Sequence, residues 1–280
     1  MWHCPLCQHP LALANAEHQT KTWRCDNRHS FDEAKSGYLN LLPVQHKHSK
    51  QPGDDKTMLN ARRCFHDGNG YLPLMQVIAE KIRKHSQLAL LPEFNLYDAG
   101  CGEGSYLGVI QASLQAEDHR VMAWGSDIAK HAVDIAAKRF SHCHFAVASS
   151  ARLPVADKSL HTVLQVFAPG HDSEYARVIA SDGLCIMVDP GPDHLWEIKQ
   201  AIYDSPRKHQ DKMGDMPGFE LLEKESLSFT IAFTSQAMRK ALLEMTPYYW
   251  RLPIDKADEL VNADFDVTAD FVVRVFKRVA

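Results

Sequence analysis

Apolar positions follow two alternating patterns along the chain. From residue 71 onward, short and mostly apolar runs alternate with segments in which apolar residues recur every three or four positions. The runs predict strands that end near Tyr97 and that span 121–124, 144–148, 162–167, 184–188, 220–233 and 264–278. The periodic segments predict helices over 56–66, 71–87, 106–114, 129–140, 175–180 and 235–245. Strands and helices in alternation predict an α/β fold with a mainly parallel sheet and closing antiparallel strands.

The sequence after the first strand of this sheet is rich in glycine. Gly100, Gly102 and Gly104 alternate with other residues just beyond Tyr97. Glycine tolerates positive φ and leaves the backbone open to a ligand, so we expect a tight turn that leads into a helix N-terminus. The spacing is G-x-G-x-G, not the G-x-G-x-x-G of a dinucleotide site. Three glycines alone also fit an ordinary turn.

Two acidic residues favour a ligand over a simple turn. Asp98 precedes the glycines, and a carboxylate there suits a cationic ammonium better than a phosphate. Asp127 follows the second strand, where it can accept hydrogen bonds from both hydroxyls of a ribose. The D-x-G-x-G-x-G pattern resembles motif I of class I S-adenosylmethionine (SAM) methyltransferases. That resemblance implies a Rossmann-like, seven-stranded sheet whose last strand is antiparallel, and SAM as cofactor.

The N-terminus carries two pairs of metal ligands. Cys4 and Cys7 form C-x2-C, and Cys25 and His29 form C-x3-H after seventeen intervening residues. Two such pairs can converge on one zinc ion, with three thiolates and one imidazole. With four protein ligands and no open position, the site reads as structural. Zinc would stabilise a segment too small to bury its own core. Such a module either holds a substrate or acts as a stabilising cap.

Charge is distributed unevenly along the 280 residues. The net charge is −4, yet residues 1–63 hold nine Lys and Arg against six Asp and Glu. The densest cationic group lies in a polar stretch after the zinc ligands: His46, Lys47, His48, Lys50, Arg62 and Arg63. These side chains suit RNA phosphates, or belong to a solvated linker. No run of about 18 apolar residues and no signal peptide is apparent, so we expect a cytoplasmic protein without membrane contact.

Motifs spread over nearly the whole chain resemble the RlmA-type 23S ribosomal RNA guanine-N1-methyltransferases. The residues that carry this resemblance are Gly37 to Lys47, Pro52–Asp54, Ala61–Arg63, Gly70-Tyr71, Gly100–Gly104, Ala148–Ser150 with Leu153-Pro154, Ala168-Pro169, Pro190–Pro192 with His194-Leu195, and Met245–Pro247. Members of that family carry a zinc module before a SAM domain. The resemblance implies methyl transfer to N1 of a guanine in a hairpin of 23S rRNA.

The resemblance also implies the residues of the cofactor site. The residues that it assigns to SAM binding in this sequence are Tyr71, Asp98, Gly100, Gly102, Glu103, Gly104, Asp127, Ser149, Phe167 and His194. Ser149 stands where related enzymes often place an acid for the adenine amino group. Phe167 begins an aromatic-proline segment of the kind that stacks a target base. From the residues alone, Tyr71 fits the core equally well, and His194 is more often structural.

These expectations define three segments and leave two other functions open. A zinc-binding, RNA-recognition module covers 1–45, a basic linker 46–70 and the SAM-dependent domain 71–280. A tRNA or protein methyltransferase would have the same cofactors and differ in substrate. An RNA-binding regulator with a residual SAM fold would show no turnover, but the intact glycines and acids argue against it. Neither the proton acceptor nor the oligomeric state, a homodimer included, is readable from the sequence.

Overall fold

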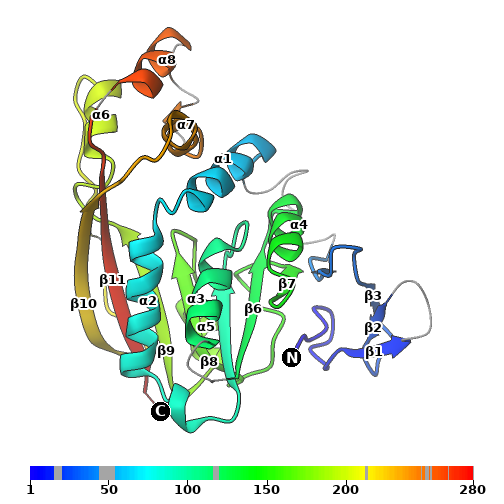
Figure 1. The fold of residues 1–280 in the computed structure, drawn as a ribbon. Helices are drawn as coiled ribbons and strands as arrows, with labels where there is room; N and C mark the ends of the chain where they lie inside the picture. Colours follow the sequence, from blue (N-terminus) through cyan, green and yellow to red (C-terminus); the bar gives the residue numbers. More distant parts are fainter. Residues whose placement is uncertain are drawn as a thin grey trace.

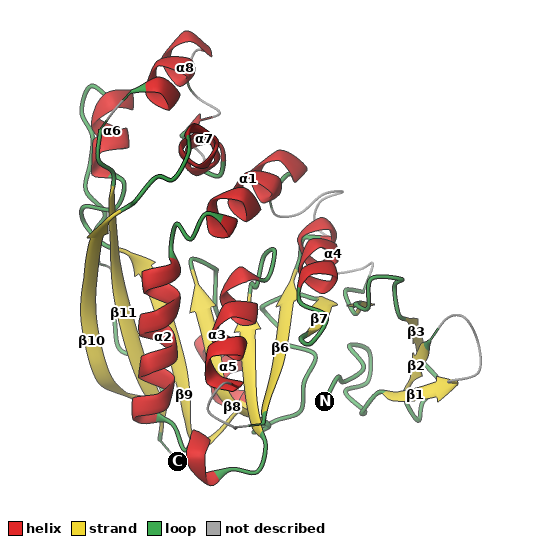
Figure 2. Ribbon diagram, viewed as in Figure 1, coloured by secondary structure: helices red, strands yellow, loops and turns green. Residues whose placement is uncertain are grey.

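The computed structural model describes most of the chain. Its described residues are 1–15, 21–43, 54–115, 120–211, 214–246, 248–249, 252, 254–263 and 265–279. In none of these parts does a helix combine the length and apolar character needed to span a bilayer. The fold is a large mixed sheet with helices on both faces, a small N-terminal sheet on one side, and a group of helices beyond the strand ends (Figures 1 and 2).

The large sheet has eight strands in the order β10-β11-β9-β8-β5-β6-β7-β4. Their bounds are Leu39–Asn40 (β4), Phe94–Ala99 (β5), Val121–Asp127 (β6), His144–Val147 (β7), Leu160–Val166 (β8), Ile179–Pro190 (β9), Phe219–Thr230 (β10) and Thr268–Arg278 (β11). From β4 to β9 each strand is parallel to its neighbour, whereas β11 runs antiparallel to both β9 and β10. The predicted α/β sheet with an antiparallel last strand is confirmed, and β4 adds an eighth strand to the seven expected.

Strand residues alternate between two hydrophobic layers because successive side chains point to opposite faces of a sheet. Leu96 and Leu164 face one layer, and their neighbours Tyr97 and Val163 face the other. The first layer packs beneath α2 (Leu72–His85), α3 (Ser105–Gln115) and α4 (Lys130–Arg139). The second layer packs against α5 (Asp172–Val178). Coverage on both faces explains why these strands read as nearly continuous apolar runs.

The N-terminal segment forms its own small sheet and then joins the large one. Strands β1 (Ala12–Asn15), β2 (Thr22–Arg24) and β3 (Ser30–Asp32) pair antiparallel in sequence order. Trp2 is buried against the large sheet, with its ring 5.1 Å from that of Trp124. β4 pairs with β7, so the chain enters the main core before residue 45. The sequence from Phe31 onward also suggests a short helical turn, but Phe31 lies in β3 and only a tight turn follows, closed by a hydrogen bond from the Gly37 N–H to the Ala34 carbonyl at 2.8 Å.

Four helices lie together beyond the sheet (Figure 1). They are α1 (Lys56–Asp67), α6 (Trp196–Ile202), α7 (Gln236–Glu244) and α8 (Ile254–Asn262). Asp55 caps α1, because its carboxylate accepts a hydrogen bond from the backbone N–H of Met58 at 2.9 Å. Leu59 and Phe65 are on the buried face of α1. This group of helices covers the end of the sheet at which the functional site lies.

Candidate active site and metal centre

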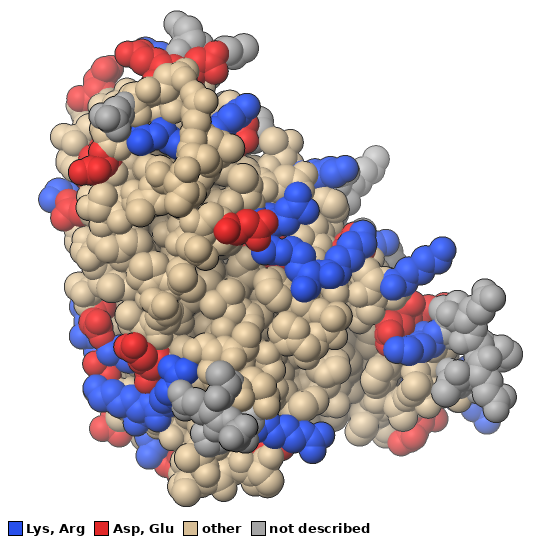
Figure 3. Space-filling model, viewed as in Figure 1, with Lys and Arg blue, Asp and Glu red and all other residues tan. Residues whose placement is uncertain are grey.

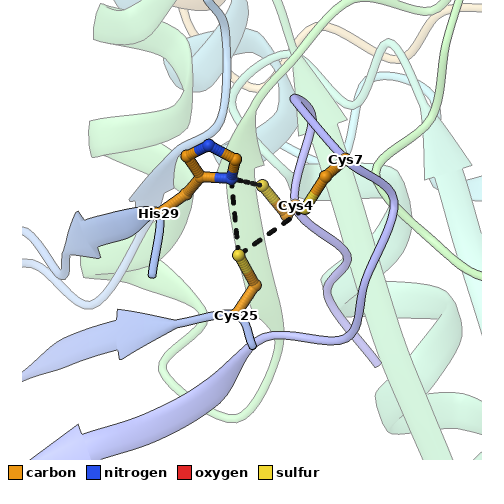
Figure 4. Close-up of side chains that lie close together, drawn as sticks. All are labelled: Cys4, Cys7, Cys25 and His29. Atoms are coloured by element: carbon orange, nitrogen blue, oxygen red, sulfur yellow. Dashed lines mark hydrogen bonds between the residues drawn. The ribbon is translucent and has the colours of Figure 1, made fainter. Parts of the chain in front are cut away.

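The two N-terminal ligand pairs converge in space, as their spacing predicts. Cys4, Cys7, Cys25 and His29 offer one ligand atom each, and all four atoms lie within 4.8 Å of one another (Figure 4). The Sγ atoms of Cys7 and Cys25 are 3.6 Å apart. His29 Nδ1 lies 3.4 Å from Cys4 Sγ and 3.5 Å from Cys25 Sγ.

These separations match the edges of a zinc-centred tetrahedron. With Zn–S near 2.3 Å and Zn–N near 2.0 Å, tetrahedral geometry places two sulfurs about 3.8 Å apart and a sulfur and a nitrogen about 3.5 Å apart. Burial raises the pKa of the Cys4 thiol to about 11, so a metal would be needed to hold that residue as a thiolate. The four residues fit a closed, structural zinc site, which is the centre of the N-terminal module.

A cavity with a volume of about 540 Å³ lies where parallel strands end. Ligands of open α/β sheets bind outside the carboxyl ends of the strands, and this volume is typical of a small-molecule site. Seven of the ten predicted SAM-binding residues meet here: Tyr71, Gly100, Gly102, Asp127, Ser149, Phe167 and His194 line the wall. Residues from six separate parts of the chain therefore share one cavity.

The glycine loop after β5 forms the floor of this cavity. Gly100 and Gly102 have φ of +88° and +54°, a region that residues with a side chain rarely adopt. A Cβ on Gly100 would lie 2.5 Å from the Cβ of Ala168. Gly100 therefore lets the loop after β8 approach, and Gly102 leaves open backbone facing the cavity. This bare backbone is a cradle that a side chain would fill.

Asp127 connects the glycine loop to the end of β6. Its two carboxylate oxygens accept hydrogen bonds from the backbone N–H groups of Gly102, at 3.0 Å, and Ala129, at 2.7 Å. Burial raises the pKa of Asp127, and these two N–H groups act in the opposite direction. Each oxygen keeps a free acceptor site, so Asp127 can still accept the ribose hydroxyls predicted for it.

Asp98, Glu103 and Gly104 lie behind the cavity wall, not in it. Burial raises the pKa of Asp98 to about 8, with the charge of Asp127 as the next contribution. The Glu103 carboxylate accepts hydrogen bonds from His66 Nδ1 at 2.8 Å, from Ser105 Oγ at 2.8 Å and from Arg139 at 2.5 Å. Although burial opposes it, these partners lower the pKa of Glu103. The structure thus gives Glu103 a place in an ion-pair cluster that supports the loop.

Tyr71 and His194 meet on the opposite wall. The Tyr71 hydroxyl lies 3.5 Å from His194 Nε2, and the backbone N–H of Asp270 donates to His194 Nδ1 at 3.3 Å. Burial lowers the pKa of His194 to about 3, so the ring is neutral and carries its proton on Nε2. Both residues lie in the cavity wall, as the resemblance implied. Tyr71 is therefore not only a core residue, and His194 is not only a structural one.

Phe167 is held in a strained conformation at the cavity mouth. Its φ is +54°, and 41% of the residue is exposed. Its ring lies 6.2 Å from that of His194 and 5.5 Å from that of Phe271. Bulky residues in the left-handed region cost about 1–3 kcal/mol, and such strain is concentrated at functional sites. The segment Phe167-Ala168-Pro169 therefore presents an aromatic face and a proline to whatever enters.

Helix α1 contributes residues whose place in the wall the sequence did not indicate. Leu59, Arg62 and His66 of α1 line the cavity, as does Asp54 just before the helix. Arg62 pairs with Asp54 at 2.5 Å, and its guanidinium lies 3.5 Å from the position of a Cβ on Gly102. Arg63, one residue on, is exposed. Among the other predicted RNA contacts, His46, Lys47 and Lys50 lie outside the described residues.

Comparisons with known proteins agree with this geometry. Residues 2–50 match the zinc-ribbon family described as "RlmA, N-terminal". A Streptomyces fradiae protein named 23S rRNA (guanine(748)-N(1))-methyltransferase is 30% identical over 259 residues, 90% of this chain and 87% of its own. YxjB of Bacillus subtilis, provisionally named a 23S rRNA (guanine-N1)-methyltransferase, is 30% identical over 98% of this chain and 96% of its own. A SAM-dependent methyltransferase of Thermotoga maritima superposes with a TM-score of 0.43 at 16% identity, covering 78% and 95% of the two chains.

The strand order, the glycine loop and the acid at the end of β6 define a class I SAM-dependent methyltransferase. The zinc ribbon precedes that catalytic domain. With relatives aligned over nearly its full length, the chain belongs to the 23S rRNA (guanine-N1)-methyltransferase family.

Proposed function

We propose that this protein transfers a methyl group from SAM to N1 of a guanine in a hairpin of 23S rRNA. The observation that carries the proposal is one cavity that combines a SAM cradle with an exposed aromatic-proline segment. SAM supplies an activated methyl group when bound. The chain's own residues therefore chiefly align the guanine with that methyl group and exclude water. The division into a ribbon of 1–45, a linker of 46–70 and a catalytic domain of 71–280 is part of the same proposal.

Each wall of the cavity suits a different part of the cofactor. Asp127 would hold the ribose hydroxyls, and the bare backbone of Gly102 would lie against the amino-acid part. Ser149, just beyond β7, offers a hydroxyl on the adenine side. Arg62 is the only lysine or arginine among the described residues that line the cavity, so it is the natural partner of the SAM carboxylate.

The other half of the cavity suits an unpaired base. N1 of guanine lies on the Watson–Crick edge, so the base must leave its pair to reach the cofactor. Phe167 and Pro169 offer flat surfaces against which an extruded base can stack. Tyr248 also lines this half. A hairpin loop supplies bases that are already unpaired, which favours it over a continuous duplex as the acceptor.

Basic side chains give the RNA a path toward this opening. A band of Lys and Arg crosses the face between α1 and the N-terminal module (Figure 3). Lys56 and Arg63 on α1, and Lys130 and Lys138 on α4, are all exposed. Such contacts position the backbone of a nucleic acid without reading its sequence. The ribbon lies at the end of this band, where it can hold the hairpin.

Transfer of labelled methyl from SAM to separate acceptors tests the proposal. The protein is incubated with 23S rRNA from a strain that lacks this gene, with 16S rRNA and with tRNA, and the nucleosides are identified by mass spectrometry. We expect 1-methylguanosine in 23S rRNA alone. Label in tRNA or protein, or a different methylated nucleoside, would overturn the proposal and restore the alternatives that share both cofactors.

Neighbouring arginines of α1 separate cofactor binding from RNA binding. Arg62→Ala is expected to weaken SAM binding about ten- to a hundredfold, because a hydrogen bond between charged groups contributes about 1.5–3 kcal/mol. Arg63→Ala is the matched control, since this side chain is exposed. It should leave the SAM dissociation constant within about twofold and reduce the salt dependence of RNA binding by about one unit of slope. Calorimetry with SAM and RNA titrations at several salt concentrations measure both; unchanged SAM binding in Arg62→Ala would contradict the assignment.

A further inference from the structure

We propose that His209 is the catalytic base that accepts the proton from guanine N1, an inference that rests on the proposed function. His209 lines the cavity of the proposed active site, as do Pro190, Met245 and Tyr248. Its ring centroid lies 6.3 Å from that of His194, which in turn lies 6.2 Å from Phe167. The imidazole is therefore connected through the ring of His194 to the aromatic-proline segment at which the base would stack.

The reaction itself requires a proton acceptor. The N1–H bond of guanine breaks and its electron pair forms the new N1–C bond. The methyl–sulfur bond breaks and its electron pair stays with sulfur, which becomes neutral. The proton from N1 passes to a ring nitrogen of His209 and then to solvent. One proton is thus released for each methyl group transferred, and no oxidant or reductant takes part.

The acidic side chains of the cavity are committed to other partners. Asp54 is paired with Arg62 at 2.5 Å. Asp127 accepts backbone N–H groups from Gly102 and Ala129 on the cofactor side. Neither carboxylate belongs to the acceptor half of the wall. Asp172, at the start of α5, and Asp189, near the end of β9, are not part of this wall, and Asp189 pairs with Arg274 at 2.8 Å.

The remaining titratable groups of the wall are poor proton acceptors. Burial raises the pKa of Tyr71, Tyr106 and Tyr248, so these hydroxyls stay protonated and cannot take another proton near neutrality. Burial also keeps Cys101 a thiol, since its pKa is raised well above the usual value. His66 is held by its Nδ1 hydrogen bond to Glu103, and only 3% of its side chain is exposed. The tyrosines and Cys101 hold protons instead of collecting one.

His194 lies close to His209 but cannot act as the proton acceptor. The N–H of Asp270 occupies Nδ1 of His194, and Nε2 already carries a proton. Its pKa of about 3 makes the ring a weak base. His209 differs because neither of its ring nitrogens has a hydrogen-bond partner among the described residues. Its backbone N–H donates to the Pro192 carbonyl at 3.4 Å, which ties this segment to the turn after β9.

The surroundings of His209 keep its ring neutral and available. Burial lowers the pKa of His209, the charge of Lys199 lowers it further, and Asp270 opposes both. The ring also lines a second cavity of about 290 Å³, whose charged groups are Asp189, Asp211 and Arg274. Arg274 pairs with both of these carboxylates. His209 thus has an opening on each side, one toward the base and one through which the proton can leave.

Single-turnover methylation with the full chain tests the assignment. Wild type, His209→Ala, His209→Gln and a remote control, His142→Ala, are compared with saturating SAM and rRNA between pH 5 and 9. His142 is exposed and lies outside both cavities. We expect His209→Ala and His209→Gln to lose about 10²–10⁴ in rate, as is typical of removing a general base. The SAM dissociation constant, measured by calorimetry, should stay within about twofold in every variant.

The pH dependence distinguishes a base from a residue that only supports the wall. The methylation rates of wild type and His142→Ala should rise with pH and level off near or below pH 6.5, the ordinary pKa of histidine. The reason is that the His209 ring must be unprotonated to act as a base and that its pKa is lowered. The His209 variants should lose this bend, and NMR titration should assign the same pKa to His209. A wild-type methylation rate in His209→Ala, or a pH profile that keeps its bend in the His209 variants, overturns the inference. Absence of 1-methylguanosine with wild type overturns the proposed function instead.

Discussion

Cys4→Ala is expected to release zinc and to unfold the N-terminal module. Cys4 is fully buried and its Sγ lies 3.4 Å from His29 Nδ1, so its loss opens the ligand set. Structural zinc contributes about 10–16 kcal/mol in zinc-finger peptides, far more than a three-stranded sheet of this size can replace. Zinc content should fall from one ion per chain to near zero. Hydrogen exchange should show loss of protection in β1, β2 and β3.

The matched control is Cys64→Ala. Cys64 is exposed on α1 and is not among the four clustered ligands. This variant should keep its zinc and its exchange pattern. In Cys4→Ala, SAM affinity should stay within about twofold because the cavity lies in the other part of the fold, whereas rRNA methylation should fall at least about tenfold if the ribbon holds the hairpin. Retained zinc in Cys4→Ala would contradict the assignment of Cys4 as a zinc ligand. Full rRNA methylation by the zinc-free variant would mean that the ribbon is a stabilising cap and does not hold the hairpin.

Asp127→Ala is expected to weaken SAM binding roughly 100-fold. The substitution removes the acceptor for the ribose hydroxyls and releases the backbone N–H groups of Gly102 and Ala129. Charge-assisted hydrogen bonds contribute about 1.5–3 kcal/mol each, and a total near 3 kcal/mol corresponds to about two factors of ten. Calorimetric titration with SAM and with its demethylated product measures the loss.

Two further variants test the cause of this loss. Asp127→Asn keeps the size of the side chain and one acceptor oxygen, so its SAM affinity should lie between those of wild type and Asp127→Ala. Asp172→Ala is the control, because Asp172 is exposed in the first turn of α5 and is absent from the cavity wall. Equal affinity of Asp127→Ala and wild type would mean that Asp127 only shapes the loop.

The parts of the site that were predictable are those encoded in short stretches of sequence. Gly100 and Gly102 adopt positive φ within one turn, and Asp127 follows directly from the apolar run of β6. The zinc ligands come in two close pairs, so that only one tertiary contact must form to complete the site. In each case the geometry is local, and residue type and spacing are sufficient to indicate it.

The rest of the site depends on packing between distant segments. Arg62 and His66 were placed in a linker helix, and nothing in their spacing indicates that α1 lies across the glycine loop. Glu103 belongs to the glycine motif, yet its carboxylate bonds to His66 and Arg139, and these two partners come from α1 and α4. His209 follows a polar stretch without periodicity, so no sequence signal marks it as part of the wall.

The elements that were missed have physical reasons as well. Ser181-Asp182-Gly183 has the composition of a turn, yet it lies inside β9, where Asp182 has a φ of +63° and the register with β8 shifts. Such an irregularity reads as a turn in sequence, although the strand continues through it. Helices α6 and α8 are short, with seven and nine residues, so each offers only about two helical turns of pattern to recognise. Their positions are set by the group of helices that covers the cavity.

Primer extension across 23S rRNA tests the central claim most directly. The rRNA, taken from a strain that lacks this gene, is incubated with the protein and SAM before reverse transcription. A methyl group on guanine N1 blocks base pairing, so the account predicts one new SAM-dependent stop, at a guanine in a hairpin, that is absent with Asp127→Ala. No stop from a protein that binds SAM and holds its zinc would contradict the account and direct the search to other acceptors.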